Sequence, residues 1–192
     1  MLKKNLGNLL IKNNIIETTQ LQLFNYGITV AGLLMANLLT AILISIFLDT
    51  VPYCILFIIL LFPIRRYSGG FHAGHPIICY LESQILILTA QLFVIHLPHI
   101  SYKYEIIMIF ISLICAAFIF LKSPIYSRYK PLNPKQEKAY GRLAKYLSVI
   151  YVLLEIIFYA ANYNKLFLLV FTVLLIQGIL LLIPEREHHP KR

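Results

Sequence analysis

The stretch GITVAGLLMANLLTAILISIFL, residues 27–48, decides the fold class of this chain. It contains no Asp, Glu, Lys, Arg or His, and it is long enough to cross a bilayer, which takes about 20 apolar residues in a helix. The composition agrees, because 59% of the 192 residues are apolar and only 13% are charged, whereas soluble domains carry about 25% charged residues. The chain is therefore predicted to be an integral membrane protein.

Five further apolar runs follow, so the prediction is an all-α, polytopic membrane protein with six transmembrane helices in a single membrane domain, residues 1–192. The run at 51–64 is short for a full crossing, so it must be short, shielded by protein or extended by its neighbours. Leucines and Ile16 recur at near-helical spacing in residues 1–20, which favours an amphipathic helix on the membrane surface over a floppy tail. The other predicted spans are residues 77–97, 104–121, 146–161 and 166–183.

The net charge of +9 is distributed unevenly between the connections. With six spans, every Lys and Arg except Lys103 and Lys165 falls on one side of the membrane. By the positive-inside rule this side is the cytoplasm, and it includes both termini, a loop at 65–79 and a basic loop at 122–145. Because the basic residues lie in short connections and not on one polar face, anionic lipid headgroups are a better counter-charge for them than nucleic acid.

The segment RRYSGGFHAGHPIIC, residues 65–79, is the only dense polar stretch that abuts a span. Its glycines allow tight backbone turns, and Pro76 suits the first turn of the next helix. Cys79 would then lie in that first turn, where the helix dipole favours a thiolate and unpaired N–H groups can stabilise an oxyanion. His72 lies seven residues earlier and can fold back to accept the thiol proton.

Other interpretations of these residues stay open. A cysteine at the end of a span is often a small buried apolar residue, and His75 is a rival base. His72 and His75 are spaced to share a metal ion, but no third ligand is evident, so neither a metal nor a cofactor is expected. Glu82 and Ser83 follow Cys79 on the same helix face, where they can orient His72, bind substrate or make a packing hydrogen bond.

The remaining polar and thiol groups within the spans are assigned to packing. Side chains that can hydrogen-bond within a membrane commonly join neighbouring helices. The two other cysteines have no basic residue nearby in the sequence. Expected interhelical hydrogen bonds therefore involve Gln84, Gln91, Glu155 and Gln177, and expected packing thiols are Cys54 and Cys115.

These residues resemble the accessory gene regulator protein B (AgrB) family of bacterial membrane endopeptidases, which mature quorum-sensing pheromone precursors. The shared pattern is a basic residue, a Gly-Gly pair, a His followed by Ala, and a Cys seven residues after that His. The chain length, the six spans and the basic loop after the fourth span are also similar, so the resemblance covers essentially the whole chain. Here the pattern comprises Arg65 or Arg66, Gly69-Gly70, His72-Ala73 and Cys79.

The resemblance implies that Cys79 is the nucleophile and His72 the general base, with the arginines, Gly69 and Gly70 in support. The implied substrate is an AgrD-like precursor, which is cleaved through a thioester on Cys79 and then cyclised to a thiolactone or lactone. The basic loop is expected to hold the acidic tail of the precursor. A homodimer in the bacterial cell membrane is also implied.

Two other classes of function compete with this one. A small peptide transporter would use the polar residues within the spans to line a path, although no internal repeat is evident. A non-enzymatic membrane scaffold would need no reactive group. Both of these should tolerate Cys79→Ala and His72→Ala, whereas an endopeptidase should not.

Overall fold

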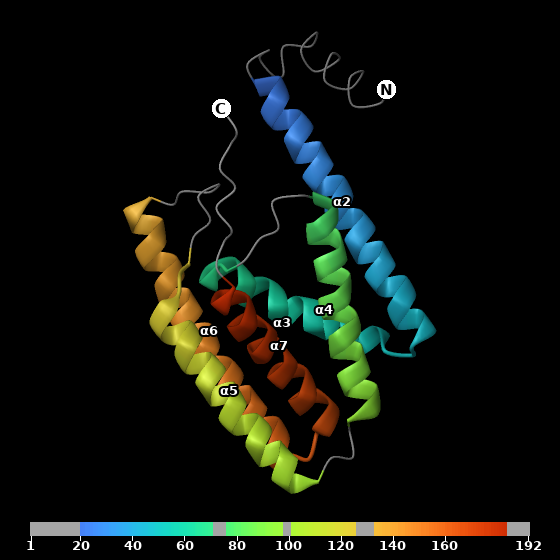
Figure 1. The fold of residues 1–192 in the computed structure, drawn as a ribbon, viewed down its shortest axis with the longest axis vertical. Helices are drawn as coiled ribbons and strands as arrows, with labels where there is room; N and C mark the ends of the chain where they lie inside the picture. Colours follow the sequence, from blue (N-terminus) through green and yellow to red (C-terminus); the bar gives the residue numbers. More distant parts are fainter. Residues whose placement is uncertain (1–19, 71–75, 98–100, 126–132, 184–192) are drawn as a thin grey trace.

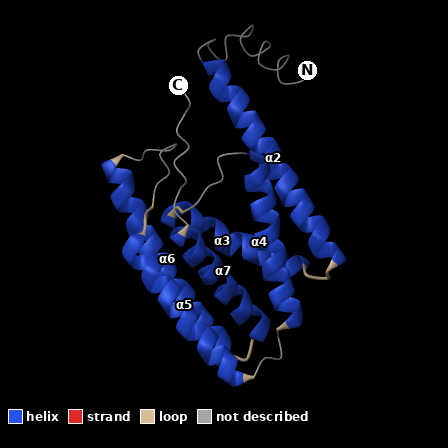
Figure 2. Cartoon of the chain, in the orientation of Figure 1, coloured by secondary structure: helices blue, strands red, loops and turns tan. Residues whose placement is uncertain are grey.

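The computed structural model describes residues 20–70, 76–97, 101–125 and 133–183, and Figure 1 shows their arrangement. Over these ranges the chain forms six α-helices and, apart from one isolated bridge, no β-structure, which confirms the all-α prediction (Figure 2). All six are long and apolar enough to cross a membrane. The amphipathic helix expected within residues 1–20 falls almost wholly outside the described residues. The helices are α2 (Leu21–Phe47), α3 (Val51–Ser68), α4 (Pro76–His96), α5 (Tyr102–Lys122), α6 (Pro134–Ala160) and α7 (Asn164–Leu182).

Helix α3 is longer than the apolar run that predicts it. It continues through Pro63 to Ser68 and takes Arg65 and Arg66 into its last turn. A proline within a transmembrane helix is tolerated when neighbouring helices and polar side chains satisfy the freed backbone groups. The short second span is therefore extended by its neighbours, and much of the polar segment at 65–79 is helical.

Helix α6 begins at Pro134, well before the predicted span at 146–161. Asn133 and Gln136 form a capping box, in which each side chain bonds the backbone N–H of the other residue, and Pro134 occupies the first turn. The sequence predicts a loop for the charged first half of α6, within residues 122–145. It is instead a helix that extends beyond the apolar span.

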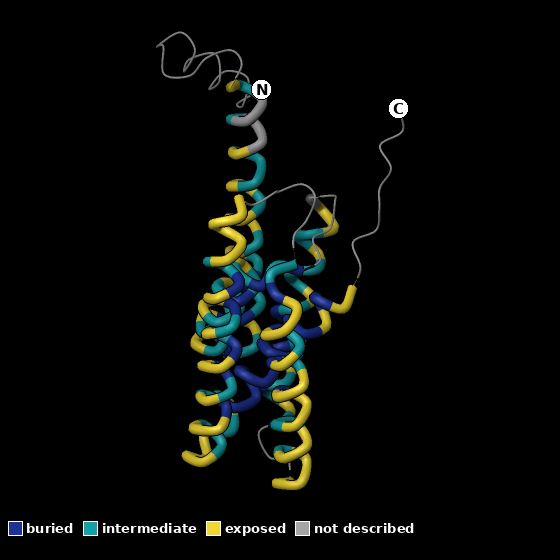
Figure 3. Tube along the Cα trace, turned by 90° about the vertical axis from the view of Figure 1, so that its left-hand side faces the viewer, coloured by how far each residue is buried: buried dark blue, intermediate teal, exposed yellow. Residues whose placement is uncertain are grey.

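Helix α7 lies at the centre of the bundle and contacts α3, α4, α5 and α6. In the most apolar stretch of α7, 72% of the residues are buried, whereas the corresponding share is 11% to 28% in the other five helices. Helix α2 lies at the edge and packs on α3 and α4, while α3 runs across the bundle at a steep tilt (Figure 1). Figure 3 shows buried residues along the middle and exposed ones on the outer faces. Many of these exposed residues are large and apolar, among them Leu34, Phe110 and Ile114, as expected for surfaces that face lipid.

Polar side chains join neighbouring helices, as the sequence predicts. The Ser112 hydroxyl donates a 2.7 Å hydrogen bond to Glu155, between α5 and α6. Gln84 of α4 donates to the Asn37 carbonyl of α2 at 3.0 Å. The Thr50 hydroxyl, just before α3, donates to Gln91 of α4. These contacts confirm the assignment to interhelical hydrogen bonds.

Candidate functional site

The site is built on the turn that ends α3. Gly69 caps the helix with a φ of +73° and Gly70 follows with a φ of +113°, values that side chains of L-residues rarely adopt. A Cβ on Gly69 would lie 1.9 Å from the carbonyl oxygen of Ile125, and one on Gly70 would lie 3.2 Å from that of Leu180. Both positions therefore require glycine because backbone from elsewhere in the chain packs directly against them.

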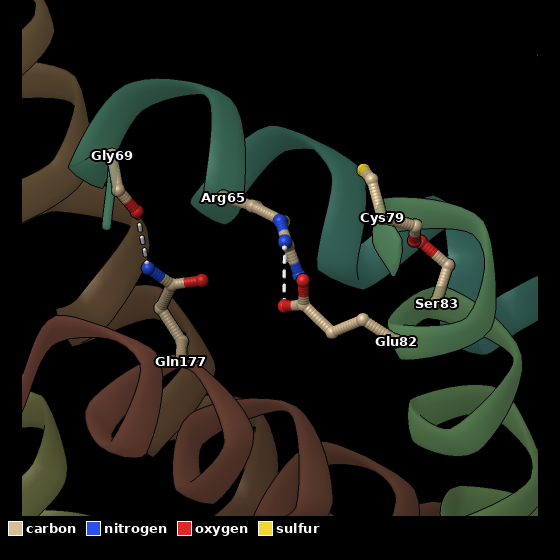
Figure 4. Close-up of polar contacts among 6 residues, drawn as sticks. All are labelled: Arg65, Gly69, Cys79, Glu82, Ser83 and Gln177. Carbon is tan, nitrogen blue, oxygen red and sulfur yellow. Dashed lines mark hydrogen bonds and ion pairs between the residues drawn. The ribbon is translucent and has the colours of Figure 1, made fainter. Parts of the chain in front are cut away.

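Two distant segments hold this turn in place. The Ile125 N–H donates to the Ser68 carbonyl at 2.9 Å, and the Gly70 N–H donates to the Ile125 carbonyl at 3.3 Å, which makes a short parallel bridge. From α7, the Gln177 amide donates to the Ser68 hydroxyl at 2.7 Å and to the Gly69 carbonyl at 2.9 Å (Figure 4). The start of the polar segment is thus fixed to α7 and to the chain that follows α5.

Cys79 is the fourth residue of α4, which begins at Pro76 as predicted. Its side chain is half-buried, and the Ser83 hydroxyl donates a 2.9 Å bond to the Cys79 carbonyl one turn earlier. The first turn of a helix presents N–H groups that have no acceptor within the helix. An acyl oxygen near Cys79 would therefore meet the positive end of α4.

An ion pair joins the helix that carries Cys79 to the end of α3. Arg65 Nη2 donates to Glu82 Oε1 at 3.1 Å, and the two side chains are only 17% and 16% exposed. Figure 4 shows the pair between the end of α3 and the turn of α4 that carries Cys79. Arg66, on the same turn of α3, is exposed. The structure therefore distinguishes two arginines that the sequence motif leaves equivalent.

The structure brings together most, but not all, of the predicted site residues. Arg65, Cys79, Glu82 and Ser83 gather around the start of α4, whereas Gly69, at the end of α3, lies on the far side of Arg65 from Cys79 (Figure 4). His72 and His75 fall in residues 71–75, outside the described part of the chain, so the choice of base stays a prediction. Among the described residues, no three metal-ligating side chains cluster.

The other two cysteines pack as expected. Cys54 is fully buried, and its thiol lies 3.8 Å from the Ala41 carbonyl. Cys115 faces Gly178 so closely that a Cβ on this glycine would lie 2.9 Å from its sulfur. Neither thiol belongs to the cluster around Cys79.

Two features of the site were missed by sequence reasoning. One is the pairing of Arg65 with Glu82, although both residues were candidates. The other is the role of Ile125 and Gln177 in holding the glycine turn. Gln177 carries a detectable signal, because an amide within a very apolar span is costly unless it has a partner, but the identity of that partner is a long-range property.

Comparison with known proteins identifies the family of this chain. The family model for accessory gene regulator B matches residues 3–181. The chain is 27% identical over 139 residues to accessory gene regulator protein B of Staphylococcus aureus strain MW2, covering 72% of this chain and 70% of that protein. The same protein of strain MRSA252 is 26% identical over the same length and coverage. No solved structure matches. The family match spans the polar turn, the cysteine helix and all but the last residue of the central helix, and the chain belongs to the accessory gene regulator B family.

Proposed function

We propose that this protein is a membrane-embedded cysteine endopeptidase that cleaves an AgrD-like pheromone precursor, with Cys79 as the nucleophile and His72 as the general base. The observation that carries the proposal is the position of Cys79, half-buried in the first turn of α4 beside the Arg65–Glu82 pair. Cys54 and Cys115, by contrast, are packing residues within the spans. Family membership supports the same role, since the chain carries the motif in its sequence and Arg65 of that motif pairs with the helix that carries Cys79.

The reaction starts with transfer of the Cys79 proton to His72. The thiolate attacks the carbonyl carbon at the end of the pheromone segment, and the adjacent C–N bond breaks. The departing amine of the acidic tail takes the proton from the His72 imidazolium, which leaves a thioester on Cys79. The N–H groups at the start of α4 stabilise the oxyanion that forms on the way.

Cyclisation follows when a Cys or Ser of the precursor attacks this thioester in place of water. The Cys79 sulfur leaves as a thiolate and regains a proton, and the product is a thiolactone or a lactone. Exclusion of water favours this outcome. The half-buried position of Cys79 supports such exclusion.

The site is proposed to face the cytoplasm, with the basic ends of the helices on the same side. Within the described ranges, most of the Lys and Arg residues lie at the end of α3, at the end of α5 and in the first half of α6. Of the described Lys and Arg residues, only Lys103 and Lys165 lie at the opposite ends of the helices. This bias supports cytoplasmic termini by the positive-inside rule. The exposed Lys122, at the end of α5, is proposed to attract the acidic tail of the precursor. A homodimer is proposed from the family resemblance alone.

The test is processing of a co-expressed AgrD-type precursor, with the membrane level of each variant measured alongside. Cys79→Ala and His72→Ala should abolish release of the tail, while Cys115→Ala should retain it. The wild-type protein should also accumulate a hydroxylamine-sensitive acyl adduct on Cys79 when the attacking Cys of the precursor is replaced by Ala. Normal processing by Cys79→Ala would refute the proposal.

A further inference from the structure

A surface groove between α5 and α6 lies apart from the candidate site. The two helices run side by side (Figure 1), and their outer faces enclose a groove of about 400 Å³. Most of its lining residues are apolar and exposed, and Phe120 lies toward the end where α5 stops. The lining includes Leu113, Ala117 and Leu121 from α5 and Val149, Val152 and Leu153 from α6.

The charged part of α6 continues the line of this groove. Lys145 Nζ lies 5.0 Å from the centroid of the Phe120 ring, directly at the groove's end. Lys138 precedes Lys145 by the same seven residues that separate Lys145 from Val152, and seven residues make about two turns. Lys138 and Lys145 therefore lie on the face of α6 that lines the groove, in the half of the helix that extends beyond the apolar span.

We propose that this groove binds an anionic phospholipid, with an acyl chain along the apolar part and the headgroup phosphate at Lys145 and Lys138. The apolar lining faces the hydrocarbon region, and the two lysines continue it to headgroup depth, so the site has the polarity of a lipid along its length. Lysines near an anionic membrane surface each contribute about 1 kcal/mol to its binding.

A second copy of this chain fits the groove less well. A two-fold interface through α5 and α6 would bring the lysine rows of both copies together, and like charges that face each other across an interface are unfavourable. The headgroup of an anionic lipid, by contrast, is attracted to the same lysines. The proposal does not depend on the proposed peptidase activity, and it assigns Lys138 and Lys145 to lipid and not to the precursor tail.

The absence of tryptophan from the chain provides a direct test. Leu121→Trp places a single fluorophore in the groove, and Phe62→Trp places one on α3 at another exposed position. Each variant is reconstituted in phosphatidylcholine vesicles with a minor fraction of phosphatidylglycerol, in which either lipid carries brominated acyl chains that quench tryptophan. At Leu121→Trp, phosphatidylglycerol should bind in preference to phosphatidylcholine, whereas at Phe62→Trp it should quench only in proportion to its abundance.

Charge variants and salt complete the test. Lys138→Gln and Lys145→Gln in the Leu121→Trp background should each lower the phosphatidylglycerol preference by about fivefold. Lys103→Gln with Lys165→Gln, at the opposite ends of the helices, should leave it unchanged. In Leu121→Trp with both lysines intact, raising the salt concentration should weaken the preference for phosphatidylglycerol. This test needs no further substitution. Equal binding of the two lipids, insensitivity to the lysines and to salt, or protection of the groove from both quenchers would each overturn the proposal.

Discussion

The Arg65–Glu82 ion pair should control activity by holding the start of α4 against the end of α3. Its atoms are 3.1 Å apart and its side chains are 17% and 16% exposed. Removing one partner of such a pair costs about 2–5 kcal/mol, mostly because the other charge loses the opposite charge beside it in a poorly hydrated position. Since both side chains keep some exposure, we expect the lower end, about 2 kcal/mol, which corresponds to roughly 30-fold slower processing in Arg65→Gln or Glu82→Gln.

The double variant distinguishes coupling from two separate effects. With both charges removed, neither charge is left without the other, so Arg65→Gln/Glu82→Gln should process the precursor within about threefold of the slower single variant. Independent effects would multiply instead to roughly 1,000-fold. The assay is the initial rate of tail release in membranes that contain equal amounts of each variant, and Arg66→Gln, exposed on the same turn of α3, is the matched control.

The rate of Cys79 alkylation tests whether the Arg65–Glu82 pair also acts electrostatically on the thiol, because a purely structural role would not change this rate in opposite directions in the two single variants. Because a nearby cation favours a thiolate and a nearby anion disfavours it, a neutral maleimide should label Cys79 faster in Glu82→Gln and more slowly in Arg65→Gln. Processing, by contrast, should fall in both. The reasoning fails if the single effects multiply in the double variant, or if Arg66→Gln slows processing as much as Arg65→Gln does.

Two further predictions concern glycines and are measured by thermal unfolding in one detergent. Gly69→Ala should lower stability by about 3 kcal/mol, because its φ is positive and the new Cβ meets the Ile125 carbonyl. Gly32→Ala, with open space around it, should leave stability unchanged or raise it by up to about 1 kcal/mol. Gly178→Ala should cost about 1–3 kcal/mol through its contact with Cys115, and Cys115→Ala should restore part of this loss because it removes the sulfur. Equal effects of Gly69→Ala and Gly32→Ala, or no recovery in Gly178→Ala/Cys115→Ala, would contradict the close contacts described here.

The sequence predicts the six spans and the place of Cys79 because these depend on local properties. Span length follows from runs of apolar residues, and Pro76 marks the start of α4 through its fixed φ. The end of α3 and the start of α6 are less predictable, because hydropathy does not indicate how far a helix continues beyond the hydrocarbon region. Lys138 and Lys145 lower the hydropathy of α6 without breaking its helix, so the run of charge resembles a loop.

The partners of the site residues follow from tertiary packing, which the sequence pattern does not encode. Arg65 and Glu82 meet because α3 and α4 pack against each other, and nothing in their spacing requires it. Gly69 is recognisable as a turn residue, but its contact with Ile125 joins segments separated by more than 50 positions in the chain. The polar groups of a site can thus be found from the sequence, whereas their pairing needs the fold.

The central position of α7 has a consequence for biosynthesis. It is the last of the six helices to leave the ribosome, yet four of the other helices pack around it. Until it enters the membrane, those helices lack their common packing partner, and the glycine turn at the end of α3 lacks the Gln177 amide. The nascent chain therefore inserts before it can assemble its site, and a ribosome that stalls ahead of α7 would leave an inserted protein without a core.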